Sequence, residues 1–317
     1  MDFVIETKEL TKRFPGDVLA VDNLNLKVRE GEVFGFLGPN GAGKTTSIRM
    51  IVGLLKPTSG NVLIRGEEIK AASWEIRQKI GVCPQEIVLW EGLNCIENLM
   101  LMGEMYGLSK GEAKERGIAL LKELKLDEKR KALAGTLSGG MKRRLNMAMA
   151  LVHEPEIVVL DEPTAGVDPQ SRVLVYDYIN SLGKEGNKTI ILTTHLMEVA
   201  DKLSKRVAII DHGKLLICDT PENLKNRIGK GDTFEFKLLK SDQNNDAVEL
   251  LKNMKDIESA NVIGDKVVLR ALNAINKMPD IFDSLGRRNI KVANLTMRRN
   301  TLEDVFINLT GRELREG

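Results

Sequence analysis

The stretch GFLGPNGAGKTTSIRMIVGLL, residues 35–55, contains the pattern G-x-x-x-x-G-K-T. The apolar run before the pattern is typical of a strand, and the segment after it is typical of a helix. Gly38 and Gly43 allow backbone N–H groups to curve around a phosphate, and the start of a helix adds the positive end of its dipole. The stretch therefore predicts a phosphate-binding loop (P-loop) between a strand and a helix.

This loop supplies the first candidate nucleotide-binding residues. We expect Lys44 to reach the β- and γ-phosphates of a nucleotide and the Thr45 hydroxyl to bind Mg²⁺. The candidate nucleotide contacts in the loop are Gly38, Pro39, Asn40, Gly41, Ala42, Gly43, Lys44, Thr45 and Thr46.

A second motif, EIVVLDEP at residues 156–163, places two carboxylates after an apolar strand. In open α/β sheets, ligands bind at the carboxyl ends of the strands. We expect Asp161 to be the metal-side carboxylate of a Walker B strand and Glu162 to polarise the attacking water. An isolated Asp-Glu pair is more often a solvated strand end, but the buried strand and the P-loop favour the catalytic interpretation.

The composition is that of an ordinary globular protein. The 317 residues are 42% hydrophobic and 29% charged, which is enough for about two domains. The net charge of +2 gives no electrostatic case for nucleic-acid binding. Cys83, Cys95 and Cys218 are odd in number and lack a Cys-x-x-Cys spacing, which argues against a disulfide framework or a zinc site and fits a reducing cytoplasm.

Two features bear on the membrane. The first residues, MDFVIETKEL, are acidic and amphipathic, unlike a signal peptide. No apolar run approaches the ~18–20 residues that a spanning helix needs. We therefore expect no membrane span in this chain, and a membrane role only through a partner.

Residues 1–228 show an alternation of short apolar strands and helical stretches. Near-continuous apolar runs are typical of strands buried on both faces of a largely parallel sheet. A helical insert is expected at about 94–155, beginning with a Leu/Met/Lys/Glu-rich segment. The strands expected in the sheet include EVFGFLG, EIVVLDEP, KTIILTTH and RVAIIDHGKLL.

Residues 229–317 have a different character, and we expect a second, smaller domain there. The order strand, helix, hairpin, helix, strand, helix predicts a ferredoxin-like α+β domain. The hairpin should turn at Gly264-Asp265, and a Thr301…Asp304 capping pattern should open the last helix. One stripe of that helix is expected to be core: Leu302, Val305, Phe306 and Leu309.

A P-loop is shared by kinases, GTPases and helicases, and the stretch LSGGMKRRL at residues 137–145 decides between them. The order P-loop, LSGG, Walker B strand and TTH resembles the nucleotide-binding subunits of ABC transporters, over roughly Val4 to Leu224. The resemblance implies an α/β P-loop NTPase core with a helical subdomain. It also implies that two subunits pack head to tail, so that each LSGG signature closes over the ATP held by the partner's P-loop. Ser138, Gly139 and Gly140 would donate to the γ-phosphate.

One residue of this stretch departs from the family motif, and the role of the basic run that follows it is open. Met141 stands where the family usually has glutamine, and a methionine cannot offer the amide. The basic run Lys142-Arg143-Arg144 has two interpretations, a solvated helix start or an electrostatic aid to phosphate binding.

Four further residues take roles from the same resemblance. Gln85, in GVCPQE, matches the Q-loop glutamine that contacts Mg²⁺ and the attacking water and links to the membrane partner. His195, in TTHLMEVAD, matches the switch histidine that hydrogen-bonds the γ-phosphate. Asp168, in AGVDP, matches the D-loop aspartate of the dimer interface. Phe14 matches the aromatic residue that stacks on adenine, with core packing as its alternative.

Some aromatic residues and histidines match no motif. His153 and His212 are expected to be structural or surface residues. Trp74 and Trp90 are expected to be packing residues, although Trp90 follows the Q-loop, where the family contacts its permease.

The ending TLEDVF…LTGR resembles ATPases that serve second-type (drug, sodium, polysaccharide or lipid) ABC export permeases. The chain is therefore expected to bind ATP and Mg²⁺ and to hydrolyse ATP as a homodimer or with a close paralogue. Its partner would be a separate integral membrane permease, which places the chain at the cytoplasmic face of the membrane. Export is favoured over import, and the cargo is chosen by the permease.

The alternative is a soluble ABC ATPase that acts on ribosomes or DNA. The ribosomal proteins usually carry two cassettes, whereas this chain has one P-loop and one LSGG. The DNA-acting proteins separate the two motifs by a long coiled coil, and no sustained heptads lie between them here.

Overall fold

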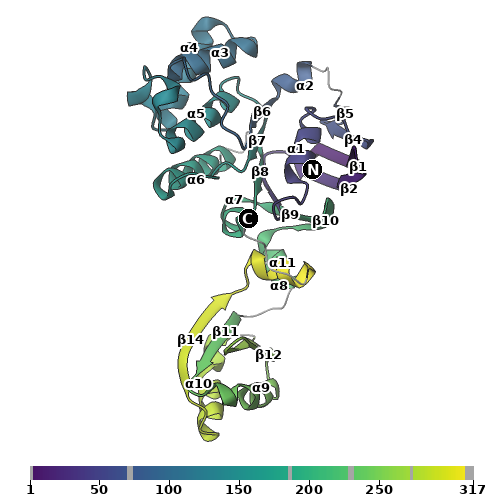
Figure 1. Ribbon diagram of the computed structural model, residues 1–317, viewed down its shortest axis with the longest axis vertical. Helices are drawn as coiled ribbons and strands as arrows, with labels where there is room; N and C mark the ends of the chain where they lie inside the picture. Colours follow the sequence, from purple (N-terminus) through teal and green to yellow (C-terminus); the bar gives the residue numbers. More distant parts are fainter. Residues whose placement is uncertain (1–2, 70–73, 185–187, 228–231, 272–273, 311–317) are drawn as a thin grey trace. The chain divides into compact units, whose positions relative to one another are not determined.

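The computed structural model describes residues 3–69, 74–184, 188–227, 232–271 and 274–310. Contacts divide the described residues into two compact units, one that ends at Pro221 (unit 1) and one that begins at Glu222 (unit 2). The domain boundary expected at 228/229 lies outside the described residues. Figure 1 shows the elements of both units.

A six-stranded sheet forms the centre of unit 1, with the order β10-β9-β3-β8-β7-β6. All strands but β10 pair in parallel, and every residue of β3, β7 and β8 is buried. This confirms the largely parallel sheet predicted from near-continuous apolar runs. The strands are β3 (Val33–Leu37), β6 (Ile80–Cys83), β7 (Ile157–Asp161), β8 (Thr189–Thr194), β9 (Arg206–Asp211) and β10 (Lys214–Asp219).

The stretch RVAIIDHGKLL is not the single strand that was expected. It breaks at His212 and Gly213, whose φ angles are +46° and +76°. Two consecutive positive φ angles suit a tight hairpin turn, so β10 returns antiparallel to β9 and forms the sheet edge.

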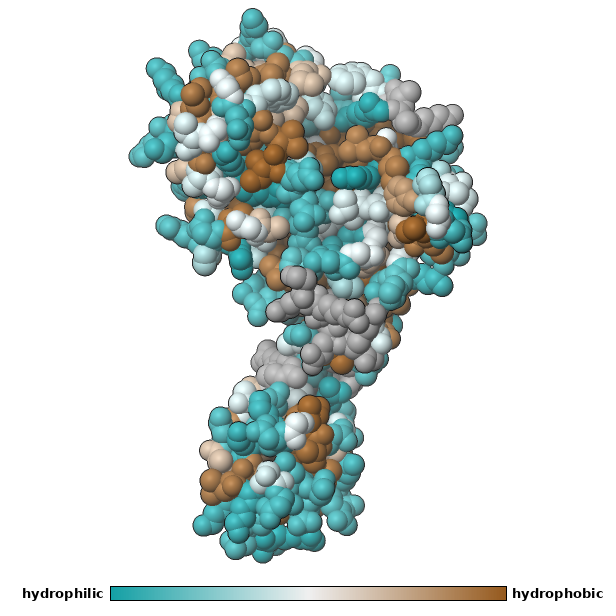
Figure 2. Space-filling view, viewed as in Figure 1, coloured by the Kyte–Doolittle hydropathy of each residue, from teal (hydrophilic) through white to brown (hydrophobic). Residues whose placement is uncertain are grey.

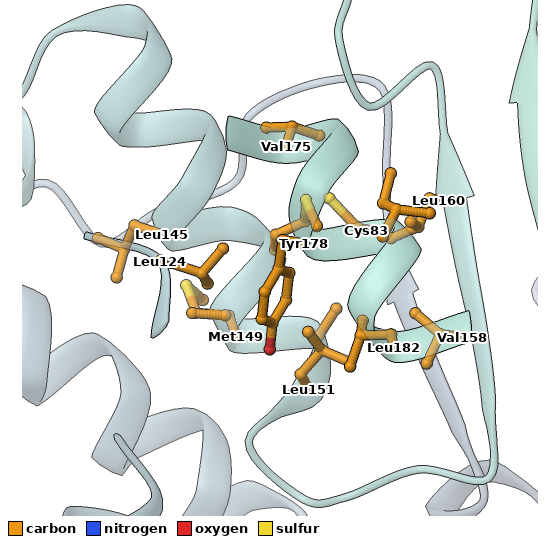
Figure 3. Packing of buried hydrophobic residues seen from close by; sticks show 14 of the residues in the cluster. Cys83, Leu124, Leu145, Met149, Leu151, Val158, Leu160, Val175, Tyr178 and Leu182 are labelled. Carbon is orange, nitrogen blue, oxygen red and sulfur yellow. The ribbon is translucent and has the colours of Figure 1, made fainter. Parts of the chain in front are cut away.

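Alternate residues of the central strands pack on opposite faces of this sheet. Val158 and Leu160 belong to a core with α5 (Gly139–Leu151) and α6 (Pro169–Lys184), part of which Figure 3 shows. Ile157 and Val159 belong to a second core with α1 (Lys44–Ile51). The helices α5 and α1 therefore cover opposite faces of the sheet (Figure 1).

The second core is completed by an antiparallel sheet that the sequence analysis did not anticipate. Its strand order is β2-β1-β4-β5, and β1 pairs with both β2 and β4. Its strands alternate buried and exposed residues because one face packs on the core. They are β1 (Phe3–Phe14), β2 (Val18–Arg29), β4 (Ser59–Ile64) and β5 (Glu67–Glu68).

The helices α3, α4 and α5 form a helical lobe at one side of the sheet (Figure 1). Capping boxes open α3 (Cys95–Met105) at Asn94 and α4 (Lys110–Glu123) at Ser109, which fixes where both helices begin. Helices α2 (Trp74–Gln78) and α7 (Met197–Leu203) lie outside the lobe.

Unit 2 has the predicted ferredoxin-like order, with the antiparallel sheet β12-β13-β11-β14. The hairpin turns at Gly264, and the Thr301–Asp304 cap forms as expected. Leu309 was expected in the core but is 41% exposed, because it lies in the last turn of α11. The elements are α8 (Pro221–Arg227), β11 (Asp232–Leu238), α9 (Asn244–Lys252), β12 (Ile257–Ile263), β13 (Lys266–Ala271), α10 (Ala274–Arg287), β14 (Val292–Arg299) and α11 (Leu302–Thr310).

Candidate active site

The loop between β3 and α1 has a backbone suited to phosphate. Gly43 has a φ of +96°, and a Cβ at this residue would lie 2.4 Å from the carbonyl oxygen of Ala20. At Gly38 a Cβ would lie 2.4 Å from the carbonyl oxygen of Ile210. Both positions therefore need glycine. Among the described residues, no side chain caps the start of α1, so its first N–H groups can serve an anion.

Lys44 folds back over this loop. Its Nζ donates to the carbonyl oxygens of Gly38 (2.7 Å) and Pro39 (3.2 Å) and lies 3.5 Å from Oε1 of Glu162. Burial lowers the pKa of the Lys44 ammonium, and the nearby Glu162 carboxylate opposes that effect. The P-loop lysine and the Walker B glutamate thus form a buried ion pair.

Two buried carboxylates stand at the end of β7. Asp161 accepts a hydrogen bond from the hydroxyl of Thr193, on the adjacent strand β8. The N–H of Glu162 donates to the carbonyl oxygen (3.2 Å) and to Oγ1 (2.9 Å) of Thr193. The φ of Glu162 is +48°, in the left-handed region that a glutamate rarely adopts. The role of Thr193 was not predicted from the sequence, although Thr193 is the first residue of the TTH motif that ends at His195.

His195 reaches the same carboxylate from the end of β8. Its Nδ1 lies 2.9 Å from Oε1 of Glu162. The histidine side chain is 41% exposed, whereas that of Glu162 is 6% exposed. Lys44, Glu162 and His195, which were predicted from three separate motifs, therefore meet at one carboxylate oxygen.

The residues assigned to Mg²⁺ offer the hard oxygen atoms that this ion prefers. Asp161 is buried at the end of β7, Thr45 is half-buried in the first turn of α1, and Gln85 has an exposed side chain. The described residues contain no group of three or more His, Cys, Asp or Glu side chains able to hold a metal. The donor set fits a Mg²⁺ ion that takes its remaining ligands from phosphate oxygens and water.

The signature forms the beginning of α5. Ser138 is the N-cap, and its Oγ accepts a hydrogen bond from the N–H of Met141 (3.3 Å). Ser138 and Gly139 are exposed, whereas Gly140 is buried. A Cβ at Gly140 would lie 2.2 Å from Oγ of Ser171, so this position needs glycine. The Met141 side chain packs against the core on the α5 face of the sheet.

Asp168 lies beside the signature, at the start of α6. Its Oδ1 accepts a hydrogen bond from the N–H of Ser171 (2.9 Å). That bond lowers the pKa of the Asp168 carboxyl. Its Oδ2 would be 2.8 Å from a Cβ at Gly140, which places the D-loop next to the signature.

The basic run after the signature fits neither of the two expected roles as a whole. Arg143 and Arg144 are 1% and 6% exposed, so neither is a solvated residue. Every hydrogen bond found for these two guanidinium groups goes to a backbone carbonyl of this chain. Only Lys142 lies near the surface, paired with Glu91 at 2.8 Å. The run of residues 145–152, which is apolar except for Asn146, signalled a helix that is buried along most of its surface.

Phe14 and Gln85 lie in exposed positions. Phe14 ends β1 with 37% of its surface exposed, which excludes the core-packing alternative. The Lys12 ammonium lies 5.3 Å from the centroid of its ring. The Gln85 side chain is exposed in the loop after β6, and no hydrogen bond of this side chain is found among the described residues.

Two tryptophans and one histidine outside the motifs were expected to have structural roles. Trp74 packs against Tyr106, with ring centroids 6.2 Å apart, although it is 48% exposed, and Trp90 is 38% exposed. His153 is structural, because it stacks on Tyr106 with ring centroids 3.7 Å apart. Burial lowers the pKa of His153 to about 4.

Comparison with protein families gives two matches. Residues 21–165 match the family described as ABC transporter. Residues 220–310 match the C-terminal domain of the ATP-binding protein DrrA1-3-like family. In the part of the chain that the structure describes, no helix is both long and apolar enough to cross a membrane.

Several curated proteins are similar over nearly the full chain. The linearmycin resistance ATP-binding protein LnrL of Bacillus subtilis is 38% identical over 97% of this chain and 99% of its own. The Nod factor export ATP-binding protein I of Cupriavidus metallidurans is 36% identical, with both chains covered completely. The doxorubicin resistance ATP-binding protein DrrA of Mycobacterium tuberculosis is 36% identical over 93% of this chain and 89% of its own.

Solved structures are similar as well. The cbiO1 protein of Clostridium perfringens, part of the ABC transporter complex cbiONQ, superposes with a TM-score of 0.65 at 27% identity, over 71% of this chain and 91% of its own. A dimeric ATP-binding cassette in a post-hydrolysis state, bound to ADP and Pi, superposes with a TM-score of 0.63 at 28% identity, over 68% and 98% of the two chains.

Proposed function

This chain belongs to the ATP-binding subunits of ABC transporters, and we propose that it hydrolyses MgATP in a head-to-tail dimer that drives an export permease. The observation that carries the proposal is the meeting of Lys44, Glu162 and His195 at one oxygen atom. It places a cation, a carboxylate and an imidazole at the carboxyl ends of neighbouring parallel strands, beside the glycine loop.

These contacts suggest how the site works. Lys44 and the P-loop N–H groups hold the β- and γ-phosphates, and His195 hydrogen-bonds the γ-phosphate. Phosphate oxygens compete with Glu162 for both Lys44 and His195, which releases the carboxylate to accept a hydrogen bond from the attacking water. Thr45, Asp161 and Gln85 would hold Mg²⁺, which would supply positive charge to neutralise the phosphates.

A second copy of the chain completes the site in this proposal. Helices α5 and α1 cover opposite faces of the central sheet, so the signature and the P-loop of one chain belong to different layers. Ser138 and Gly139 are exposed at the start of α5, where N–H groups and the helix dipole favour an anion. That anion is the γ-phosphate held by the partner.

An exposed apolar patch is the proposed permease-docking surface. Ile87, Val88 and Trp90, in the loop after Gln85, are 42%, 56% and 38% exposed. Leu101 and Met105 of α3, the first helix after this loop, are exposed as well. Hydrophobic residues (brown) also gather where the helical lobe meets the sheet in Figure 2. Exposed apolar patches of this kind mark protein interaction sites.

The direction of transport and the location of this chain are proposed from the names of its relatives. Their names concern resistance to linearmycin and doxorubicin and the export of Nod factor. Outward transport is therefore the proposed direction, with this chain at the cytoplasmic face of the membrane, where ATP is available. The proposed site serves the phosphates of ATP, and the choice of cargo is assigned to the permease.

Lys44→Ala tests the nucleotide-binding half of the proposal. Removal of a charge-assisted contact to phosphate should cost about 1.5–3 kcal/mol, which raises the Kd for ATP roughly 10- to 100-fold. Titration with a fluorescent ATP analogue measures this change. Lys27→Ala, at a 57% exposed lysine of β2, is the matched control and should bind normally. Tight ATP binding by Lys44→Ala would contradict the P-loop assignment.

A chain that ends at Pro221 tests the role of unit 2. The P-loop, Glu162, His195 and the signature all lie in unit 1, so the truncated chain should still bind ATP. We propose that unit 2 limits how far two cassettes separate, which raises the effective concentration of one for the other. Truncation should therefore raise the protein concentration at half-maximal ATPase activity and leave the plateau rate per dimer nearly unchanged. Collapse of the plateau with intact ATP affinity would place unit 2 in the catalytic cycle instead.

A further inference from the structure

Arg143 is buried at the junction of three functional segments. Its exposure is 1%, and all five of its N–H donors are used. Nε donates to Pro163 O (2.9 Å), Nη1 donates to Pro84 O (2.6 Å) and Gln85 O (3.0 Å), and Nη2 donates to Asp161 O and Glu162 O (both 2.8 Å). One side chain of the signature helix therefore joins the Q-loop to the end of β7.

A second residue on the same face of α5 holds the other end of the Q-loop. Asn146 lies three residues after Arg143, and residues with this spacing are neighbours on a helix. Its Oδ1 accepts from the N–H of Val88 (3.3 Å), and its Nδ2 donates to Sγ of Cys83 (3.4 Å). The loop 83–88 is thus attached to α5 at both ends.

The contact of Arg143 with Glu162 bears on the catalytic carboxylate. Glu162 has a φ of +48°, a conformation that persists only where its surroundings hold it. Its N–H is held by Thr193, and its carbonyl oxygen is held by Arg143. Loss of the guanidinium would leave the carbonyl side of this peptide without its charged donor.

We propose that Arg143 is a positioning residue that fixes Glu162 relative to the Q-loop, so that a displacement of the loop 83–88 is passed to the catalytic carboxylate. The inference rests on the proposed role of Glu162 in ATP hydrolysis. Because Arg143 belongs to the helix that begins at Ser138, the same side chain connects the signature, which serves the partner's nucleotide, with this chain's own Glu162. All of its hydrogen bonds go to backbone carbonyl oxygens, so it acts through the backbone.

The experiment compares Arg143→Gln and Arg143→Lys in the full chain. A misplacement of a catalytic group by about 1 Å can cost on the order of 100-fold in rate, so kcat of Arg143→Gln should fall about 100-fold. Its KM for ATP should stay within about threefold of wild type, because the P-loop contacts remain. Arg143→Lys keeps the charge and three donors and should lose only about tenfold. Amide hydrogen exchange should become faster in both 84–88 and 161–165.

Two controls separate positioning from general damage. Arg206→Gln removes another largely buried arginine, 16% exposed, from the opposite end of the parallel strands, and should leave kcat unchanged. In a Glu162→Gln background, Arg143→Gln should add no further loss of turnover, because both changes act on one step.

A wild-type kcat in Arg143→Gln would overturn the proposal. If only Arg143→Lys folds, a wild-type kcat in that variant would overturn it. It is also overturned by faster exchange in only one of the two segments, or by further loss of turnover in the double variant. Normal turnover of Glu162→Gln alone would instead contradict the proposed function.

Discussion

Glu162→Gln is expected to abolish turnover while ATP binding persists. Glutamine has nearly the same shape and keeps an oxygen that can accept from His195 and Lys44, so the fold and the phosphate contacts should survive. The amide cannot take up a proton or polarise water as a carboxylate does. General base catalysis typically contributes 10²–10⁴-fold, and kcat should fall by about that factor.

The same variant should accumulate as an ATP-bound dimer, because hydrolysis no longer reopens it. Light scattering with and without ATP measures this change in mass. Glu156→Gln is the matched control: this glutamate precedes the same strand, β7, but stands at its opposite end, 43% exposed and paired with Arg65. It should hydrolyse ATP normally. Turnover by Glu162→Gln at the wild-type rate would show that Glu162 is not the base.

The parts of the site that could be predicted from the sequence are those whose chemistry needs a residue type at a fixed position. Gly43 needs a positive φ and space beside Ala20, and Glu162 needs the carboxyl end of a buried strand. Such requirements leave a pattern in the sequence, so the parallel sheet and the loop were predicted correctly. The ferredoxin-like order of unit 2 was also predicted, because its turn and cap residues mark where elements begin.

The parts that could not be predicted depend on contacts between distant segments. A basic run after a turn is usually solvated, and only the three-dimensional structure shows that Arg143 is surrounded by carbonyl groups of residues 84–85 and 161–163. The left-handed backbone of Glu162 has no sequence signal either, because the hydrogen bonds to its N–H and carbonyl groups come from Thr193 and Arg143, which are distant in the sequence. The antiparallel sheet of β1, β2, β4 and β5 was missed because its strands lack long apolar runs.

A mixture of Ser138→Arg and Lys44→Ala subunits is expected to recover ATPase activity that neither variant has alone. Arginine at the exposed N-cap of α5 should block closure over the partner's nucleotide, while the P-loop of the same chain remains intact. In a head-to-tail heterodimer, one site combines the intact P-loop of one chain with the intact signature of the other. The second site carries both defects.

Ser138→Arg also removes the N-cap of α5, and the loss of a helix cap by itself lowers the free energy of unfolding by about 1 kcal/mol. A control variant separates this effect from the block of closure. Ser109→Arg removes the equivalent cap of α4, at an exposed serine bonded to Glu112, and should keep full activity. Ser138→Arg alone should still bind ATP, which fluorescence titration of the single variant can verify.

The measurement is the ATPase rate of the two variants mixed in equal amounts, against the rates of each alone. Random pairing of symmetric dimers gives half heterodimers with one working site each, so the mixture should reach about a quarter of the wild-type rate. That recovery is the result predicted if each signature serves the partner's P-loop. A mixture no more active than the sum of its parts, with heterodimers shown to form, would contradict the shared nucleotide site.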